Sequence, residues 1–192
     1  MNPYSYPDTE LRFNLRLIKE GRGWLRYGVD FPVAQASCYP ESNTARGEYF
    51  RPGKSSSGPL AILVHGWGDH SVLPLRLLAR ALLREGIASF LLYLPFHSSR
   101  LPPVVRKRLP RLTPEEWFCG YQISVTDIRR IVDWATSTGV AERGQIAVIG
   151  LSLGGFISSI AMGVDERISA GVSLLTGGNS AKIMQLGSAG AF

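Results

Sequence analysis

The sequence predicts an α/β protein built on a mostly parallel sheet with helices on both of its faces. Two observations lead to this prediction. From residue 60 onward, short apolar runs alternate with longer segments whose apolar residues recur at helical spacing, and this alternation is typical of strand–helix–strand units. The apolar runs are also continuous rather than interrupted by polar residues, as expected of strands that are buried on both faces.

Four apolar runs flanked by glycines or prolines are predicted as strands: residues 60–66, 87–94, 145–150 and 168–175. The segments between them have helical periodicity. One such segment stops at Gly86 and a later one covers residues 153–162. The apolar positions of the first segment are Leu75, Leu78, Ala79, Leu82 and Leu83.

A longer helix is predicted to begin after Thr113. The Thr113 hydroxyl can cap the helix, Pro114 suits its first turn, and Glu116 completes a capping box. Apolar residues then keep to one face until Gly139, which is expected to end the helix. They are Trp117, Tyr121, Val125, Ile128, Val132 and Ala135.

The 192 residues are long enough for a single domain with a substantial core. Residues 59–178 form its predicted core. Residues 1–58 form a leading segment, in which residues 33–50 have room for two antiparallel edge strands and residues 11–19 fit either a helix or a strand. Residues 179–192 are expected to begin a lid or helix that is truncated, so the sheet itself is expected to be incomplete at its carboxyl-terminal end.

The composition, with 45% hydrophobic and 19% charged residues, is that of a globular protein. Cys38 and Cys119 make no disulfide framework, and the polar first ten residues lack the features of a secretory signal. A cytoplasmic location is therefore expected. Residues 144–164 carry no charge and are long enough to span a bilayer. Their five glycines and three serines fit a strand, a turn and a helix better, so no membrane span is predicted.

The net charge of +6 is concentrated in residues 97–111, which contain five basic residues and no acidic one. A basic segment can bind an anionic partner. However, the aromatic residues of a nucleic-acid-binding platform are absent from it, and three prolines stiffen it. It is therefore interpreted as a solvated basic loop, and no nucleic-acid partner is predicted. The basic residues are Arg100, Arg106, Lys107, Arg108 and Arg111.

A serine framed by glycines follows the third predicted strand. Residues 150–154 read Gly-Leu-Ser-Leu-Gly, which matches the G-x-S-x-G motif with Ser152 at its centre. In this motif the nucleophile stands on a tight turn between a strand and a helix, and Gly150 and Gly154 let the two elements approach each other. Ser152 is therefore predicted to be a nucleophile, at the carboxyl end of the sheet where ligands bind in open α/β folds.

A second motif lies upstream, where His65-Gly66-Trp67-Gly68 follows the first predicted strand. With both motifs in this order, the chain resembles the α/β-hydrolase superfamily over residues 59–178. The resemblance implies a serine esterase without a cofactor, which transfers the acyl group of a small-molecule ester. It also implies that the backbone N–H groups of Trp67 and Leu153 form an oxyanion hole, and that His65 shapes its loop.

Residues 65–70 also have the spacing of the H-x-H-x-D-H zinc motif of metallo-β-lactamase-like hydrolases. Trp67 stands where that motif has its second histidine, and the chain has only three histidines. Because a zinc site is defined by its ligand count, no metal site is predicted. The glycines around Ser152 also lack the lysine of a P-loop, which makes a nucleotide improbable.

The residues that would activate Ser152 are not evident. In the α/β-hydrolase order, an acid and then a histidine follow the serine, but only Asp165 and Glu166 are acidic after Ser152, and no histidine follows it. Both acids are expected at the opposite end of the sheet. His97 or His70 remains open as a relocated base, because triads are defined by geometry.

The favoured explanation is that the sequence is the N-terminal portion of a hydrolase, whose acid and histidine lie beyond residue 192. Two functions follow from this reading. The first is a serine hydrolase that acts on an ester-type substrate through Ser152. The alternative is a catalytically inactive truncated fragment or a binding module.

Overall fold

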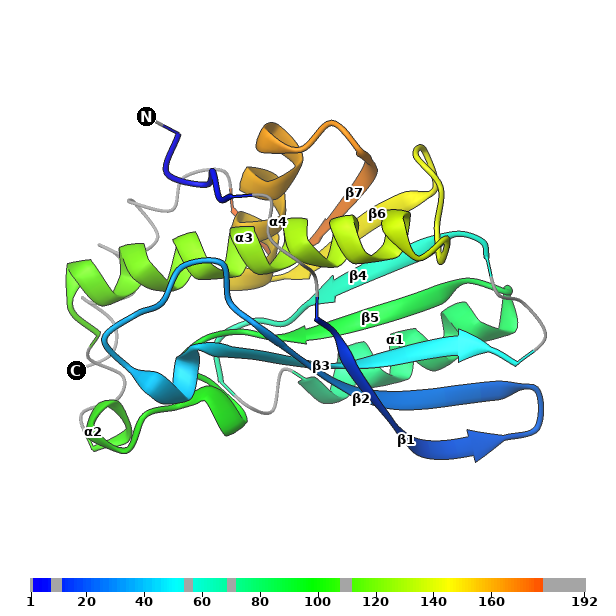
Figure 1. The fold of residues 1–192 in the computed structure, drawn as a ribbon, viewed down its shortest axis with the longest axis horizontal. Helices are drawn as coiled ribbons and strands as arrows, with labels where there is room; N and C mark the ends of the chain where they lie inside the picture. The colour runs from blue at the N-terminus through cyan, green and yellow to red at the C-terminus, as the bar shows by residue number, and fades with distance from the viewer. Residues whose placement is uncertain (1, 8–11, 54–56, 69–71, 108–111, 178–192) are drawn as a thin grey trace.

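The computed structural model of the protein describes residues 2–7, 12–53, 57–68, 72–107 and 112–177. These residues contain a seven-stranded sheet with the strand order β1-β2-β3-β5-β4-β6-β7 (Figure 1). The strands are β1 (Asn14–Gly21), β2 (Trp24–Pro32), β3 (Thr44–Pro52), β4 (Leu60–Val64), β5 (Ala88–Tyr93), β6 (Ile146–Leu151) and β7 (Ile168–Leu174). The α-helices are α1 (Val72–Arg84), α2 (Pro103–Arg106), α3 (Pro114–Ser137) and α4 (Leu153–Val164).

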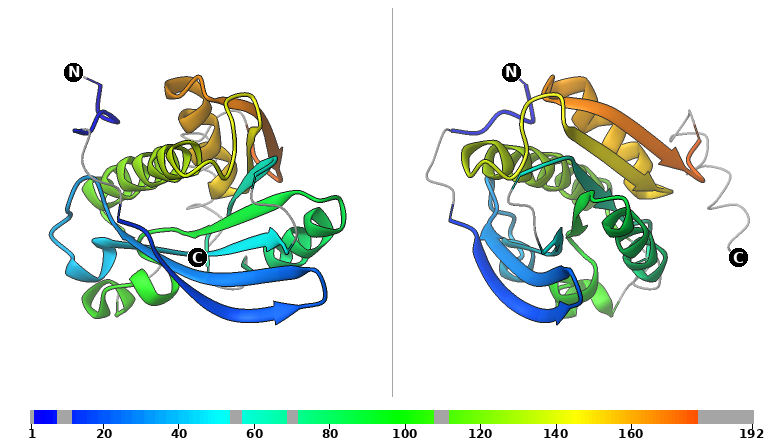
Figure 2. Two further views of the ribbon diagram at one scale, coloured as in Figure 1. Left: turned by 45° about the vertical axis from the view of Figure 1, so that its right-hand side comes forward. Right: turned by 90° about the vertical axis from the view of Figure 1, so that its right-hand side faces the viewer.

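The sheet combines a parallel part with an antiparallel leading edge. Strands β5, β4, β6 and β7 run parallel to one another, whereas the β1–β2, β2–β3 and β3–β5 pairs are antiparallel. Helices α3 and α4 cover one face, and α1 covers the other (Figure 2). The predicted class, a mostly parallel sheet with helices on both faces, is confirmed. No described helix is long and apolar enough to cross a membrane.

The burial pattern follows from this layering. Every residue of β4 is buried, because helices pack on both of its faces. The last strand, β7, has one paired edge, and most of its residues are exposed. The strand thus lies at the edge of the described sheet.

The predicted helix after Thr113 is confirmed together with its cap. The Glu116 N–H donates to Thr113 Oγ1 at 3.3 Å, and the Thr113 N–H donates to Glu116 Oε2 at 2.8 Å. The helix ends at Ser137, and Gly139 follows in a left-handed conformation with φ of 70°. The chain thereby turns from α3 towards β6.

The leading segment differs from the prediction. Residues 33–50 hold one strand, β3, and not two, because the loop before β3 is closed by its own hydrogen bonds. The Ser37 N–H donates to Asn43 Oδ1 at 2.7 Å, and Asn43 Nδ2 donates to the Ser37 carbonyl at 2.9 Å. The other antiparallel strands, β1 and β2, lie earlier in the chain. Residues 179–192 are outside the described residues, so the start of a lid there stays a prediction.

The basic segment is not a uniformly solvated loop. Arg100 is fully buried, and its Nη1 donates to Asp127 Oδ2 at 2.8 Å and to the Tyr93 carbonyl at 2.8 Å. A buried guanidinium needs such a partner, because an isolated charge is costly to remove from water. Arg106 and Lys107 are exposed as expected, and Arg108 and Arg111 lie outside the described residues.

Candidate active site

Ser152 stands at the carboxyl end of β6, where it is the N-cap residue of α4. Its side chain is exposed, and its backbone has φ of 51° and ψ of −113°, a conformation that residues with a Cβ rarely adopt. The turn is held by backbone groups. The Ser152 N–H donates to the Leu174 carbonyl at 2.8 Å, and the Ser152 carbonyl accepts from the Gly155 N–H at 2.9 Å.

The glycines around Ser152 let backbones approach each other. A Cβ added at Gly150 would lie 2.3 Å from the Gly154 carbonyl oxygen, and one added at Gly154 would lie 2.1 Å from the Val64 carbonyl oxygen. A Cβ at Gly155 would lie 2.0 Å from Thr176 Oγ1. The serine turn is therefore packed directly against the end of β4 and the segment after β7.

The His65 loop lies beside this turn. The His65 ring is fully buried, its Nε2 accepts from the Leu94 N–H at 3.0 Å, and its Nδ1 lies 2.7 Å from the Gly66 carbonyl oxygen. Because Nε2 accepts, the ring proton is on Nδ1 and is donated to that carbonyl. His65 thus hydrogen-bonds to backbone on both sides and ties its loop to the end of β5.

His97 reaches the same end of the sheet from the loop after β5. Its ring packs edge-on against the Trp67 ring, with the centroids 4.8 Å apart, and it also contacts His65. His97 Nδ1 lies 2.9 Å from the Pro95 carbonyl oxygen, whereas the base of a serine triad has a carboxylate at this nitrogen. The one carboxylate among the residues found to line the adjoining cavity, Glu116, bonds to Tyr39 and Thr113 instead.

A small apolar cavity lies between the start of α4, the N-terminal half of α3 and the loops after β4 and β5. Its free volume is about 20 Å³, room for about one water molecule. Most of its wall is aromatic or aliphatic, and the side chains of Trp67 and Leu153 both contribute to it. The other lining residues with large apolar side chains are Leu94, Phe96, Leu112, Trp117, Tyr121 and Ile157.

The loop that carries His97 is held in a strained backbone conformation. Phe96 and Ser98 both have positive φ, at 62° and 49°. Buried Arg100 anchors this loop, because its N–H donates to the His97 carbonyl at 2.9 Å and its side chain is paired with Asp127. Among the described residues other than glycine, those with positive φ are Phe96, Ser98, Ser152 and Leu175, all in segments that follow β5, β6 or β7.

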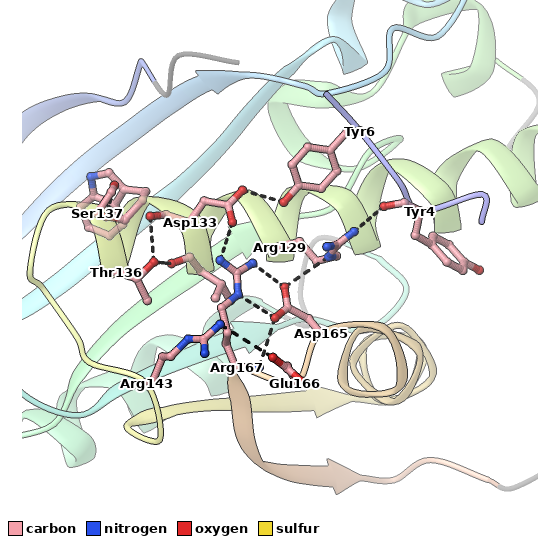
Figure 3. Close-up of polar contacts among 12 residues, drawn as sticks. Tyr4, Tyr6, Arg129, Asp133, Thr136, Ser137, Arg143, Asp165, Glu166 and Arg167 are labelled. Carbon is pink, nitrogen blue, oxygen red and sulfur yellow. Dashed lines mark hydrogen bonds and ion pairs between the residues drawn. The ribbon is translucent and has the colours of Figure 1, made fainter. Parts of the chain in front are cut away.

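The two acids after Ser152 lie at the opposite end of α4, as expected from the sequence. Asp165 is buried, and both its oxygens accept from the Arg167 guanidinium, at 2.8 and 2.6 Å (Figure 3). Burial alone would raise the pKa of Asp165, but the hydrogen bonds from Arg167 and Arg129 outweigh it and lower the pKa. Glu166 is exposed and pairs with Arg143 at 3.7 Å.

The structure thus brings Ser152, Leu153, Trp67, His65 and His97 together at one end of the sheet. His70 lies outside the described residues. The sequence does not show that Phe96 and Trp117 line the cavity, because helical or loop spacing alone does not tell which apolar residues face a site. Nor does it indicate Thr176, whose hydroxyl donates to the Ser152 carbonyl at 3.1 Å.

The sheet topology, the strand–turn–helix at Ser152 and the adjoining His65 loop define an α/β hydrolase. A family model supports this class: "Alpha/beta hydrolase domain containing 18" matches residues 32–187. The chain belongs to this family. No curated protein matches it in sequence.

Solved structures with the same fold include esterases. The chain is similar to the acetyl xylan esterase from Paenibacillus sp. R4, with 21% identity, a TM-score of 0.66, and coverage of 87% of this chain and 55% of the other. An esterase from an Arctic intertidal metagenomic library has 21% identity, a TM-score of 0.67 and coverage of 86% and 66%. Acetyl xylan esterase 1 from Thermoanaerobacterium sp. JW/SL YS485 has 12% identity, a TM-score of 0.65 and coverage of 94% and 58%. The chain therefore spans between 55% and 66% of the length of these structures.

Proposed function

We propose that the protein is a serine hydrolase that cleaves a small-molecule carboxylic ester by acyl transfer, with Ser152 as its nucleophile. The single observation behind this proposal is the placement of Ser152, exposed and in a strained conformation at the N-cap of α4. Such strain persists where the surrounding structure enforces it, and it clusters at functional sites. In the proposed reaction Ser152 Oγ attacks the ester carbonyl carbon, and a base passes the serine proton to the departing alkoxide, which leaves as the alcohol. Water then hydrolyses the acyl-enzyme, which frees the carboxylic acid and restores Ser152.

The backbone N–H groups of Trp67 and Leu153 are proposed to bind the oxyanion that forms in this step. Neither N–H has a hydrogen-bond acceptor among the described residues. The Leu153 N–H lies in the first turn of α4, where the helix dipole favours negative charge. Two unpaired donors beside a nucleophile are what stabilisation of a tetrahedral intermediate requires.

The apolar cavity beside Leu153 has room for about one water molecule, so it is proposed to take only a methyl-sized part of the acyl group, which its aromatic and aliphatic wall suits better than an alcohol. Proton transfer is assigned to neither His65 nor His97, since the former bonds to backbone through both ring nitrogens and the latter faces a carbonyl. The triad acid and histidine stay a prediction for residues beyond 192.

A fluorophosphonate probe tests the proposal. The protein made from its native gene is expected to be labelled, and mass spectrometry of tryptic peptide 144–167 should locate the adduct among its three serines. We expect the adduct on Ser152, and Ser152→Ala should abolish it. Exposed Ser159, two turns along the same helix, provides the matched control, and Ser159→Ala should be labelled like the wild type.

An adduct on Ser159 or equal labelling of Ser152→Ala would show that another residue is the nucleophile. A native protein that is not labelled at all would favour a catalytically inactive role. For the 192-residue chain, ester hydrolysis is expected near background, with the residual rate that binding and oxyanion donors provide. Turnover by this chain that disappears in His97→Ala would instead identify His97 as the base.

A further inference from the structure

A second cavity lies at the end of the sheet opposite to Ser152. Its volume is about 290 Å³, and it is lined by Arg22, Gly23, Trp24, Arg80, Leu83 and Arg84. It therefore lies between the turn that joins β1 to β2 and the last turns of α1. Trp24 pairs with Pro52 at the far end of β3, whereas the start of β3 pairs with Tyr93 at the carboxyl end of β5. The cavity is thus remote from the proposed nucleophile.

Three exposed arginines surround this cavity without a carboxylate partner. Within the described residues, Arg22, Arg80 and Arg84 form no ion pair. Two neighbouring arginines do have a carboxylate partner. Arg26 and Arg76 both bind buried Glu48, at 2.8 and 2.7 Å. The buried carboxylate of Glu48 is therefore already shared by two other arginines, and the three arginines that line the cavity have no carboxylate partner among the described residues.

The acids close by in sequence do not line the cavity. Glu20 pairs with Leu25, one residue out of phase with the Gly21–Trp24 pair. Because successive residues of a strand point to opposite faces, Glu20 lies on the other face of the hairpin from Trp24. Glu85 follows α1 directly and is not among the lining residues. Arginines are therefore the only charged residues of these described segments that line the cavity.

Neutralising the carboxyl end of α1 does not explain the arginines. Basic side chains often satisfy the last carbonyl groups of a helix. Here backbone groups already bond two of these carbonyl groups, since the Ile87 N–H donates to the Leu82 carbonyl at 3.0 Å and the Gly86 N–H to the Leu83 carbonyl at 3.2 Å. Arg80 and Arg84 are also spaced four residues apart, where like charges repel each other.

We propose that this cavity binds a small phosphate-bearing anion. Arg22, Arg80 and Arg84 would donate to the phosphate oxygens, for which the planar guanidinium fork is well suited. Half-buried Trp24 would form the apolar wall. The turn is held in place because the Gly53 N–H donates to the Gly23 carbonyl at 2.8 Å, and the volume is close to the lower end of the range for small-molecule sites.

Inorganic pyrophosphate is the probe for this site, with binding to the 192-residue chain measured by calorimetry and by the fluorescence of Trp24. We expect saturable binding that Arg22→Gln, Arg80→Gln and Arg84→Gln each weaken about tenfold, the loss of one charge-assisted hydrogen bond. The triple variant should lose binding, and Trp24→Phe should remove the fluorescence change. A second arm with phosphatidylglycerol vesicles, compared with phosphatidylcholine vesicles, distinguishes a lipid headgroup from a free phosphate.

The matched control removes the same number of positive charges elsewhere, by the combined substitutions Arg106→Gln, Lys107→Gln and Arg143→Gln at exposed positions. This control should bind pyrophosphate within about threefold of the wild type, because only long-range charge is lost. Equal loss in both triple variants would show diffuse attraction and overturn the site, as would absence of binding in both arms. Thermal melting checks folding, and Arg22→Gln alone changes only an exposed turn residue.

Discussion

The two ends of helix α4 differ in what holds them. At its N-terminus, Ser152 is fixed by backbone hydrogen bonds and by glycines packed against neighbouring strands, in a conformation that costs free energy. At its C-terminus, Asp165 is fixed by charged hydrogen bonds from Arg129 and Arg167, and Arg167 also binds Asp133 at 2.7 Å. One end is strained and neutral, and the other is relaxed and ionic.

The C-terminal end of α4 is explained by stability, whereas the proposed function is at its N-terminal end. The ionic end forms a closed network, which the N-terminal segment completes, because Tyr6 donates to Asp133 at 2.6 Å and Arg129 donates to the Tyr4 carbonyl at 2.6 Å (Figure 3). Each charge there has a partner, so stability alone explains the residues. At this end the Ser152 hydroxyl is exposed, and the N–H groups of Leu153 and of nearby Trp67 have no acceptor among the described residues, which is why the proposed chemistry is placed there.

The largest expected effect is at the strained end, for Gly154→Ala. The new Cβ would lie 2.1 Å from the Val64 carbonyl oxygen, a backbone atom that cannot move without displacing β4. We expect the free energy of unfolding, measured with urea, to fall by about 3 kcal/mol. Gly163→Ala is the matched control in the same helix. Nothing lies within 4 Å of its added Cβ, and alanine should stabilise the helix by roughly 0.5–1 kcal/mol. Equal stability of both variants would contradict the packing described here.

At the ionic end, Asp165→Asn is expected to lower the free energy of unfolding by about 2 kcal/mol, because the two arginines lose a charged acceptor. The substitution should leave labelling of Ser152 by the probe unchanged. Glu166→Gln is the neighbouring control. Its ion pair with Arg143 spans 3.7 Å between side chains that are 87% and 74% exposed, so its effect should stay within about 0.5 kcal/mol. Loss of labelling in Asp165→Asn would show that the ionic network also supports the nucleophile, which would contradict the separate roles of the two ends of α4.

The contribution of Asp165 to the free energy of unfolding should also depend on pH. Its pKa is lowered in the folded protein by the hydrogen bonds from Arg167 and Arg129, despite burial. The unfolded chain therefore binds a proton at higher pH than the folded chain does, and the contribution is complete above the ordinary aspartate pKa and lost as pH falls through the folded pKa. The stability difference between wild type and Asp165→Asn should be constant near neutral pH and shrink below about pH 4. A difference that grows in acid would mean that the sign of the shift is wrong.

The sequence predicted the parts of this comparison that depend on local pattern. The turn at Ser152 and the capping box at Thr113 are both encoded within a few neighbouring residues, and periodicity placed the parallel strands. The position of Asp165 at the far end of α4 also followed from the length of that helix.

The missed features depend on contacts between distant segments. The burial of Arg100 cannot be predicted from its neighbours in sequence because its partner, Asp127, is 27 residues away on α3. The positions of Phe96 and Trp117 at one cavity likewise require the packing of a loop against a helix. In the leading segment, the sequence of β1 fits a helix as well as a strand. Most of its residues are exposed on both faces, so apolar and polar residues do not alternate as they do in a strand with one buried face.

The smallest expected effect, and the one that tests strain most directly, is for Ser152→Gly. The φ of 51° and ψ of −113° are disfavoured for any residue with a Cβ. Ser152→Ala keeps the Cβ and should change the free energy of unfolding by less than about 0.5 kcal/mol, because the side chain is exposed. Ser152→Gly should relieve the strain and raise the free energy of unfolding by about 1 kcal/mol, even though glycine increases the entropy of the unfolded chain. Both variants should lose probe labelling, because both lack the hydroxyl. Only Ser152→Gly should also gain stability, because only glycine relieves the backbone strain. If Ser152→Gly is instead less stable than Ser152→Ala, the turn stores no strain, and the N-terminal end of α4 is as relaxed as its ionic end.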